Sequence, residues 1–257
     1  MASTATVAVR RVTDPAPALS PSSGRLKVSL QRHFEVVLDG VRIQVPHSGQ
    51  RLVAFLAINE GPLPRDVVAA ELWSEATGDR ASAALRTALW RLGPAVARSL
   101  VVASGGRLAL GPDVDVDFRA TAERAQAIIH GRAGPAARHD VAALRAAGDL
   151  LPDWYDDWVI LERERFRQLR IDALETLCST LSADDHYAGA IEAGLAAVAA
   201  EPLREQSHRV LIAAHLAAGN PGEALRQYRI LRELLARELG VAPSAATERL
   251  LVSMAPR

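Results

Sequence analysis

The sequence YAGAI at residues 187–191 is followed 34 residues later by PGEAL at residues 221–225. The two segments align so that Ala190 corresponds to Ala224 and Ile191 to Leu225, and a helical run follows each of them. A repeat of this length is typical of paired helices that bury their apolar faces only by stacking on the next pair. The sequence therefore predicts a stack of helix pairs in this part of the chain. Such stacks bind partners rather than catalyse reactions.

Length and composition are those of an ordinary globular protein. The 257 residues give room for one large domain or two ordinary ones, and a hydrophobic content of 49% allows a sizeable core. Arginine outnumbers lysine by 29 to one, a bias typical of GC-rich coding sequences, so its abundance alone is weak evidence for nucleic-acid binding.

The net charge is zero but unevenly distributed. Residues 25–111 carry eleven basic and seven acidic side chains, whereas residues 112–257 carry 17 and 22. A basic half joined to an acidic half indicates a DNA-contacting module next to a module for another partner, although a neutral two-domain enzyme can show the same distribution.

The sequence also bears on redox chemistry and location. Cys178 is the only cysteine, so no intrachain disulfide can form, and its place in a helical pattern predicts a buried, inert thiol. No apolar run approaches the roughly 18 residues that span a membrane. Residues 1–24 lack the apolar core of a secretory signal and are interpreted as a disordered tail. We therefore expect a cytoplasmic protein without membrane contact.

The first third of the chain alternates strand and helix patterns. A strand at 26–30 precedes a hairpin of residues 34–38 and 41–45, whose Asp39-Gly40 supplies the positive φ angles of a type I′ turn. Three helices are expected next: one capped by Ser48, one opened by Pro64 that buries Val67, Val68 and Leu72, and one from about Arg80. Strands at 100–103 and 107–110 flank the Gly105-Gly106 turn.

Helices separated by short breaks follow Asp117, which is expected to cap the helix that begins at Phe118. Helices followed by a two-stranded hairpin are typical of a winged helix, a helix-turn-helix variant whose last helix enters the major groove of DNA.

The third helix carries the candidate DNA contacts. If Leu85, Ala88, Leu89 and Leu92 face the core, a different set lies on or beside the exposed face. That set is Ser82, Arg86, Thr87, Trp90 and Arg91.

Each of these side chains has a role that its chemistry allows. Arg86 can donate two hydrogen bonds to guanine O6 and N7, which is worth about 1–3 kcal/mol of discrimination. Ser82 and Thr87 can bond to phosphate or bases, Arg80 suits a phosphate, and Arg107 on the hairpin can reach the backbone or the minor groove. In the alternative interpretation the arginines solvate an exposed helix face and Trp90 belongs to the core.

Five blocks of this sequence, in order, resemble the Streptomyces antibiotic regulatory proteins. They are FEVVLDG at 34–40, ALRTALWRL at 84–92, LPDWYDDWV at 151–159, EPLRE at 201–205 and ELGVAPS at 238–244. The match covers about residues 26–250. The resemblance implies a mainly α fold with small β-sheets. It places an OmpR-type winged helix-turn-helix in residues 25–111 and an all-α, tetratricopeptide-like bacterial transcriptional activation domain in residues 112–257.

The resemblance also implies a function. Members of the family are activators that bind direct repeats in double-stranded DNA upstream of promoters, often as two protomers side by side. They engage RNA polymerase holoenzyme, and their targets lie in secondary-metabolite clusters. This chain departs from the family at Gly93-Pro94, where paired basic residues usually continue the recognition helix. We therefore expect that helix to end early, because proline favours a break.

Other interpretations remain open or are disfavoured. A ligand-sensing or scaffold protein could use the groove of the repeats, with the winged helix as a protein-interaction module. No enzyme, metal or cofactor is predicted: His208 and His215 have no third ligand, and Asp113, Asp115 and Asp117 lack the glycine of a calcium loop. Trp154 and Trp158 are interpreted as an aromatic anchor between two helical layers. The charged run at 162–170 is interpreted mainly as a solvated helix face, with an interface between domains or with RNA polymerase as the alternative.

Overall fold

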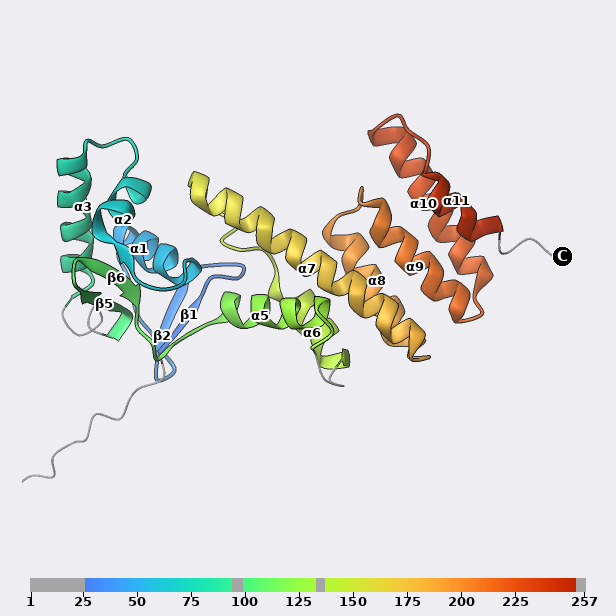
Figure 1. The fold of residues 1–257 in the computed structure, drawn as a ribbon, viewed down its shortest axis with the longest axis horizontal. Helices are drawn as coiled ribbons and strands as arrows, with labels where there is room; N and C mark the ends of the chain where they lie inside the picture. The colour runs from blue at the N-terminus through green and yellow to red at the C-terminus, as the bar shows by residue number, and fades with distance from the viewer. Residues whose placement is uncertain (1–25, 94–98, 133–136, 253–257) are drawn as a thin grey trace, which may run out of the picture.

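The computed structural model describes residues 26–93, 99–132 and 137–252, so the tail at 1–24 lies outside it. Figure 1 shows an elongated molecule with the strands and several helices at one end and a stack of helices extending to the other. Within the described ranges, no helix is both long and apolar enough to cross a membrane. The predicted mainly α architecture with an N-terminal winged helix is confirmed.

The first sheet has the strand order β3-β2-β1-β7, with β7 parallel to β1 and the other pairs antiparallel. Its strands are β1 (Leu26–Ser29), β2 (Glu35–Leu38), β3 (Val41–Arg42) and β7 (Val114–Val116). Asp39 and Gly40 join β2 to β3 with φ angles of 49° and 81°, so the predicted hairpin turn is confirmed.

Three helices and a second sheet, ordered β4-β6-β5, complete the winged helix. The elements are α1 (His47–Ile58), β4 (Leu63–Pro64), α2 (Arg65–Leu72), α3 (Gly78–Arg91), β5 (Val101–Ser104) and β6 (Arg107–Leu110). Gly105 and Gly106 both have positive φ, as the two-residue turn of the predicted β5–β6 hairpin requires.

Two local predictions in this region are wrong. Ser48 does not cap α1: the helix already begins at His47 after Pro46, and among the described residues the buried Ser48 hydroxyl has no hydrogen-bond partner. Val67 is 43% exposed rather than buried, because the short helix α2 turns Val68, Ala69 and Leu72 toward the core.

The predicted cap at Asp117 is confirmed only in part, for a reason that matters to the architecture. Helix α5 (Asp117–Ile129) begins at Asp117 itself, and the Asp117 carboxylate accepts a hydrogen bond from the N–H of Phe118 at 2.7 Å. The carboxylate of Asp117 accepts hydrogen bonds from the backbone N–H groups of Leu30, at 2.8 Å, and Gln31, at 3.3 Å. Asp117 therefore ties the start of the helical region to the end of β1.

The predicted aromatic anchor between two helical layers is confirmed for Trp158, at the start of α7 (Asp157–Ala183), whereas Trp154 lies before this helix and packs beside the first sheet. Trp158 meets Phe55 of α1 edge to face with ring centroids 5.2 Å apart, and Trp154 stacks on Phe34 at 5.9 Å. These contacts join the start of α7 to the core of the winged helix.

The helical region stacks antiparallel neighbours along α7, which packs against α5, α8 and α9 (Figure 1). The remaining helices are α6 (Ala137–Ala147), α8 (Tyr187–Ala200), α9 (Glu205–Ala217), α10 (Pro221–Glu238) and α11 (Ala245–Val252). The repeat-related residues Ala190 of α8 and Ala224 of α10 are both fully buried. The 34-residue period therefore marks equivalent positions in successive helix pairs.

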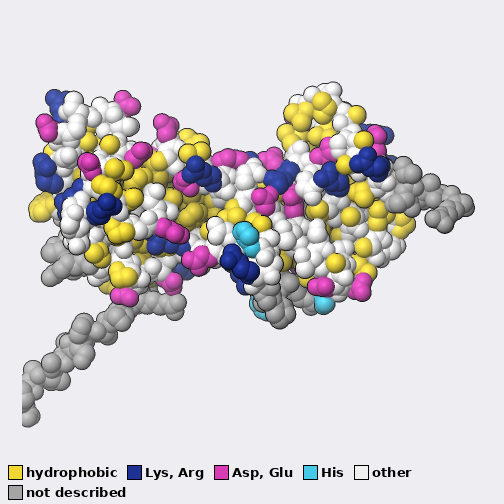
Figure 2. Space-filling model, in the orientation of Figure 1, with side chains coloured by type: hydrophobic (Ala, Val, Ile, Leu, Met, Phe, Trp, Pro, Cys, Tyr) yellow, Lys and Arg dark blue, Asp and Glu magenta, His cyan; other side chains and the backbone are white. Residues whose placement is uncertain are grey.

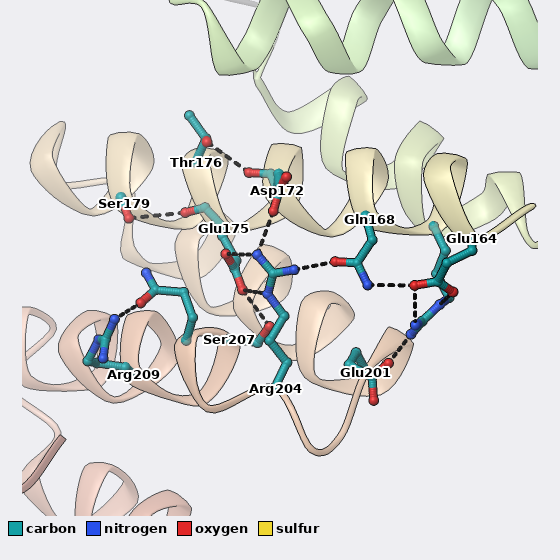
Figure 3. Close-up of polar contacts among 12 residues, drawn as sticks. Glu164, Gln168, Asp172, Glu175, Thr176, Ser179, Glu201, Arg204, Ser207 and Arg209 are labelled. Atoms are coloured by element: carbon teal, nitrogen blue, oxygen red, sulfur yellow. Dashed lines mark hydrogen bonds and ion pairs between the residues drawn. The ribbon is translucent and has the colours of Figure 1, made fainter. Parts of the chain in front are cut away.

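A polar cluster joins α7 to the start of α9 (Figure 3). Arg204 donates hydrogen bonds to the carboxylates of Glu175 and Asp172 and to the side-chain oxygen of Gln168, and Ser207 donates to Glu175. Burial by itself lowers the pKa of Arg204, but the hydrogen bonds and charges of Glu175 and Asp172 raise it above its ordinary value. The guanidinium thus stays charged and connects the two helices.

The prediction of a solvated face at 162–170 is wrong for two arginines. Arg163 donates hydrogen bonds to the backbone carbonyls of Leu150, Leu151 and Trp154. Arg170 is only 7% exposed and bonds to the carbonyl of Gly148. Both side chains reach back to the loop before α7, which a helical charge pattern does not reveal.

Candidate DNA-binding face

Helix α3 is fixed in the winged helix by its apolar side. Ala81, Leu85 and Ala88 are buried, Leu92 just after the helix is also buried, and Leu89 is half-buried against the core. At about 100° of rotation per residue, these positions occupy one side of the helix. The expected core side of α3 is confirmed, and the opposite side is free to meet a partner.

The structure brings the candidate residues of α3 onto this outer side. Arg80, Arg86, Thr87, Trp90 and Arg91 are exposed, and Ser82 is half-buried at one border. Trp90 lies almost opposite Leu85 and Ala88 and has 81% of its surface exposed, so the alternative of a core tryptophan is wrong.

The arginines on this side differ from several others of the chain in their contacts. In the part of the chain that the structure describes, Arg80, Arg86 and Arg91 have no hydrogen-bond or ion-pair partner. Arg119, Arg124, Arg163 and Arg204, in contrast, are all bonded internally. Figure 2 shows basic side chains at several points along the end of the molecule that α3 forms. Free guanidinium groups on one helix are available to phosphates or base edges.

Thr87 has a different environment, because its hydroxyl donates to the backbone carbonyl of Ala83, at 3.0 Å. The hydroxyl oxygen can still accept a hydrogen bond from a partner. Ala83 itself is exposed on the outer side, about two helical turns from Trp90, and it was not among the predicted contacts. The small side chain of Ala83 lets a partner approach the helix closely. In the sequence, the spacing of seven residues between Ala83 and Trp90 already indicates that both lie on the same side of the helix.

The wing is held against the helices. β6 packs on α1 and α2, and the backbone N–H of Arg65 at the start of α2 donates to the carbonyl of Gly106, at 3.1 Å. Arg107 is exposed on this hairpin, and its Nη1 donates to the carbonyl of Pro62 at 3.0 Å. The wing thus presents one anchored guanidinium at the same end of the molecule as α3 (Figure 1).

Helix α3 ends at Arg91, and Gly93 adopts a left-handed conformation with φ of 73°. The expected early end of the helix is confirmed as far as Gly93, while Pro94 lies outside the described residues. Among the described residues, the candidate contacts on this side therefore lie between the start of α3 and Arg91, and on the wing.

Two other titratable side chains, Cys178 and His208, are buried inside the helical region. Burial raises the pKa of the Cys178 thiol to about 12, which confirms a buried and unreactive cysteine. His208 is buried, with Nε2 2.9 Å from the carbonyl oxygen of Pro202 and Nδ1 2.7 Å from the side-chain nitrogen of Gln227. Among the described residues, no three His, Cys, Asp or Glu side chains are grouped to hold a metal ion.

A comparison with protein families matches residues 113–253 to the bacterial transcriptional activator domain. The chain belongs to this family. The regulatory protein AfsR of Streptomyces coelicolor is 29% identical over 246 residues, which are 91% of this chain and 24% of that protein. AfsR of Streptomyces griseus is 32% identical over 203 residues, or 75% of this chain and 20% of that protein. The chain thus spans about a quarter or less of these relatives.

The transcriptional regulator RedD of Streptomyces coelicolor is 38% identical over 84 residues, which cover 33% of this chain and 24% of RedD. The resemblance to the Streptomyces antibiotic regulatory proteins is therefore confirmed. A solved structure of Mycobacterium tuberculosis EmbR, in complex with a low-affinity phosphopeptide, superposes with a TM-score of 0.67. It has 24% identity and covers 91% of this chain and 66% of that chain, which shows a shared fold.

Proposed function

We propose that this activator-family protein binds DNA sequence-specifically by placing the outer side of α3 in the major groove. The observation that carries the proposal is the set of guanidinium groups of Arg80, Arg86 and Arg91, without partners in the described structure, on an exposed helix face that also carries Trp90. An exposed tryptophan leaves apolar surface in water, and exposed arginines without internal partners are available to phosphates and base edges.

In this proposal the residues of the DNA-binding face have different roles. Arg86, near the middle of the face, reads guanine edges, while Arg80 and Arg91 near the two ends bond to phosphates. Ser82 and Thr87 bond to phosphates or bases, and Trp90 with Ala83 makes apolar contacts such as those with thymine methyl groups. Arg107 on the wing reaches the backbone or the minor groove.

In this proposal the chain has two parts. Residues 25–111 contact the DNA, and residues 112–257 hold a second protomer on a direct repeat and engage RNA polymerase holoenzyme. The targets would be promoters of secondary-metabolite genes, and the protein would act in the cytoplasm. The fixed junction at Trp158 and Asp117 supports the proposal, because a rigid junction sets where a bound protomer presents its helical stack to a neighbour.

A footprint on the promoters that neighbour the coding gene tests the binding step. We expect protection of two repeats in the same orientation. A transcription assay on the same promoter with purified RNA polymerase holoenzyme tests the activation step, and we expect more transcript in the presence of the protein. Protection without added transcript would contradict activation. A chain that protects no promoter DNA would favour the ligand-sensing or scaffold alternative.

A further inference from the structure

A groove of about 710 Å³ lies between α6, α7 and α8, away from the DNA-binding face. Its walls are mostly aliphatic, with Leu144 of α6, Leu174 of α7 and Ile191 and Leu195 of α8. Leu195 is half exposed there, which leaves apolar surface uncovered. A concave apolar site of this size is typical of pockets that take small organic molecules, about 300–1,000 Å³ in volume.

The deepest charged group of the groove is Arg170. Its side chain is more than nine-tenths buried, and it bonds to the carbonyl of Gly148 and, at 3.1 Å, to the Asp149 carboxylate. Its Nε is buried and, within the described structure, has no hydrogen-bond partner. An unsatisfied buried donor is costly, and an acceptor brought by a ligand would offset that cost.

The rim of the groove carries a second arginine. Arg145 pairs with Glu192 at 3.2 Å, and both side chains are well exposed. An exposed ion pair of this kind contributes little to stability, so Arg145 can turn to another anion at small cost. Glu192 and Asp149 are themselves solvated and need no cation, whereas Arg170 is desolvated. This asymmetry favours a negatively charged ligand over a positive one.

We propose that the groove between α6, α7 and α8 binds a small amphipathic anion, a compact apolar molecule with one acidic group. The apolar body lies against Leu174, Ile191 and Leu195. The acidic group lies between Arg145 and Arg170 and competes with Asp149 for the Arg170 guanidinium.

The position of the groove gives such a ligand a route to the winged helix. The backbone carbonyl of Asp149 accepts a hydrogen bond from the N–H of Arg32, at 2.8 Å, and the N–H of Leu151 donates to the carbonyl of Leu30, at 2.9 Å. The loop that lines the groove is therefore bonded to the end of β1. A ligand that draws Arg170 from Asp149 acts on the junction between the two parts. A regulatory effect on DNA binding rests on the proposed function, but ligand binding itself does not.

The test uses the full chain and two fluorescent probes. 8-Anilinonaphthalene-1-sulfonate carries an anionic group on an apolar body, and N-phenyl-1-naphthylamine is its uncharged counterpart. We expect one sulfonate probe per chain, bound about tenfold more tightly than the neutral probe. Arg145→Gln should reduce this difference without weakening the neutral probe. Equal affinity for the two probes, or no saturable binding, would overturn the proposal.

Two alanines provide a matched pair of variants that locate the probe. Ala199→Phe places a ring in the groove from an exposed position of α8 and should abolish saturable binding of the sulfonate probe. Ala120→Phe makes the same change at an exposed position of α5 outside the groove and should leave binding unchanged. Equal binding by both variants would place the probe elsewhere.

Two further measurements test what fills the groove and whether its binding affects the contacts with the winged helix. Light scattering shows whether a second copy covers the groove: a wild-type dimer that Ala199→Phe converts to a monomer would overturn the small-molecule assignment. Hydrogen exchange at the amides of Arg32 and Leu151 should change when the sulfonate probe saturates the chain. Unchanged exchange at both amides would contradict the route to the winged helix.

Discussion

The guanidinium of Arg119 in α5 closes the C-terminal end of α1, with its Nε donating to the carbonyl oxygen of Ala57 at 2.8 Å. Its Nη2 donates to the carbonyls of Leu56 and Asn59, at 3.0 and 3.2 Å. Carbonyl groups at a helix end lack partners within the helix and carry partial negative charge, so a cation suits this position. One side chain of the helical region thus completes a helix of the winged helix.

Arg119→Ala should therefore destabilise the whole chain. Hydrogen bonds to a charged group contribute about 1.5–3 kcal/mol, and we expect a loss within that range in urea unfolding. Arg226→Ala, which removes an exposed pair with Glu223 on α10, is the control and should cost less than about 1 kcal/mol. Equal effects of the two changes would show that the contact of Arg119 with α1 contributes nothing specific.

His208 should make stability depend on pH. Its Nε2 donates to Pro202 and its Nδ1 accepts from Gln227, so the ring is neutral when folded. Burial lowers the pKa of His208 below its ordinary value of about 6.5. The contribution of the neutral His208 ring to the free energy of unfolding is complete above about pH 6.5. It falls as the pH drops through the folded-state pKa, because the unfolded chain takes up the proton first.

Urea unfolding at pH 7.5 and at pH 5.5 measures this dependence. Between these values His208→Gln should lose less stability than the wild type, whereas exposed His130→Gln should match the wild type. If the free energy of unfolding changes equally between the two pH values in His208→Gln and in the wild type, the role of His208 is contradicted.

Trp90 should report on DNA directly. Because its ring is 81% exposed, Trp90→Phe should change the free energy of unfolding by no more than about 0.5 kcal/mol. Wild-type tryptophan fluorescence should change on addition of promoter DNA, and the change should be largely absent in Trp90→Phe. A fluorescence change of the same size in the variant would assign the signal to another tryptophan and remove Trp90 from the interface.

Arg80 and Arg91 should act through phosphates rather than sequence. Replacing either by alanine should weaken binding to cognate and unrelated DNA by similar factors. It should also reduce the slope of log affinity against log salt by about one. Fluorescence anisotropy at several salt concentrations measures both quantities. A loss confined to the cognate sequence would instead make the variant residue a reader of bases.

Much of the fold follows from local patterns in the sequence. The Asp39-Gly40 turn, the β5–β6 hairpin and the core side of α3 depend on neighbouring residues, and periodicity predicts them well. The long-range contacts do not. Asp117 looks like a helix cap but bonds to the end of β1, and Arg163 looks solvated but bonds to the loop before α7. Only the folded chain brings those partners together.

The candidate DNA-binding face can likewise be predicted from the sequence only in part. Helical spacing places Arg86, Trp90 and Arg91 on the outer side of α3, since the leucines fix which side is inner. Whether an arginine has an internal partner depends on the whole fold, which spacing alone cannot reveal. Arg107 illustrates this limit, because its bond to Pro62 crosses 45 positions of sequence.

The most direct test is the affinity of Arg86→Ala for its promoter site. By fluorescence anisotropy, loss of a two-bond contact to guanine should weaken cognate binding by about 1–3 kcal/mol, with unrelated DNA far less affected and the melting temperature nearly unchanged. Arg232→Ala, an exposed arginine of α10, should bind like the wild type. If Arg86→Ala binds the cognate site as tightly as the wild type, α3 does not read the DNA.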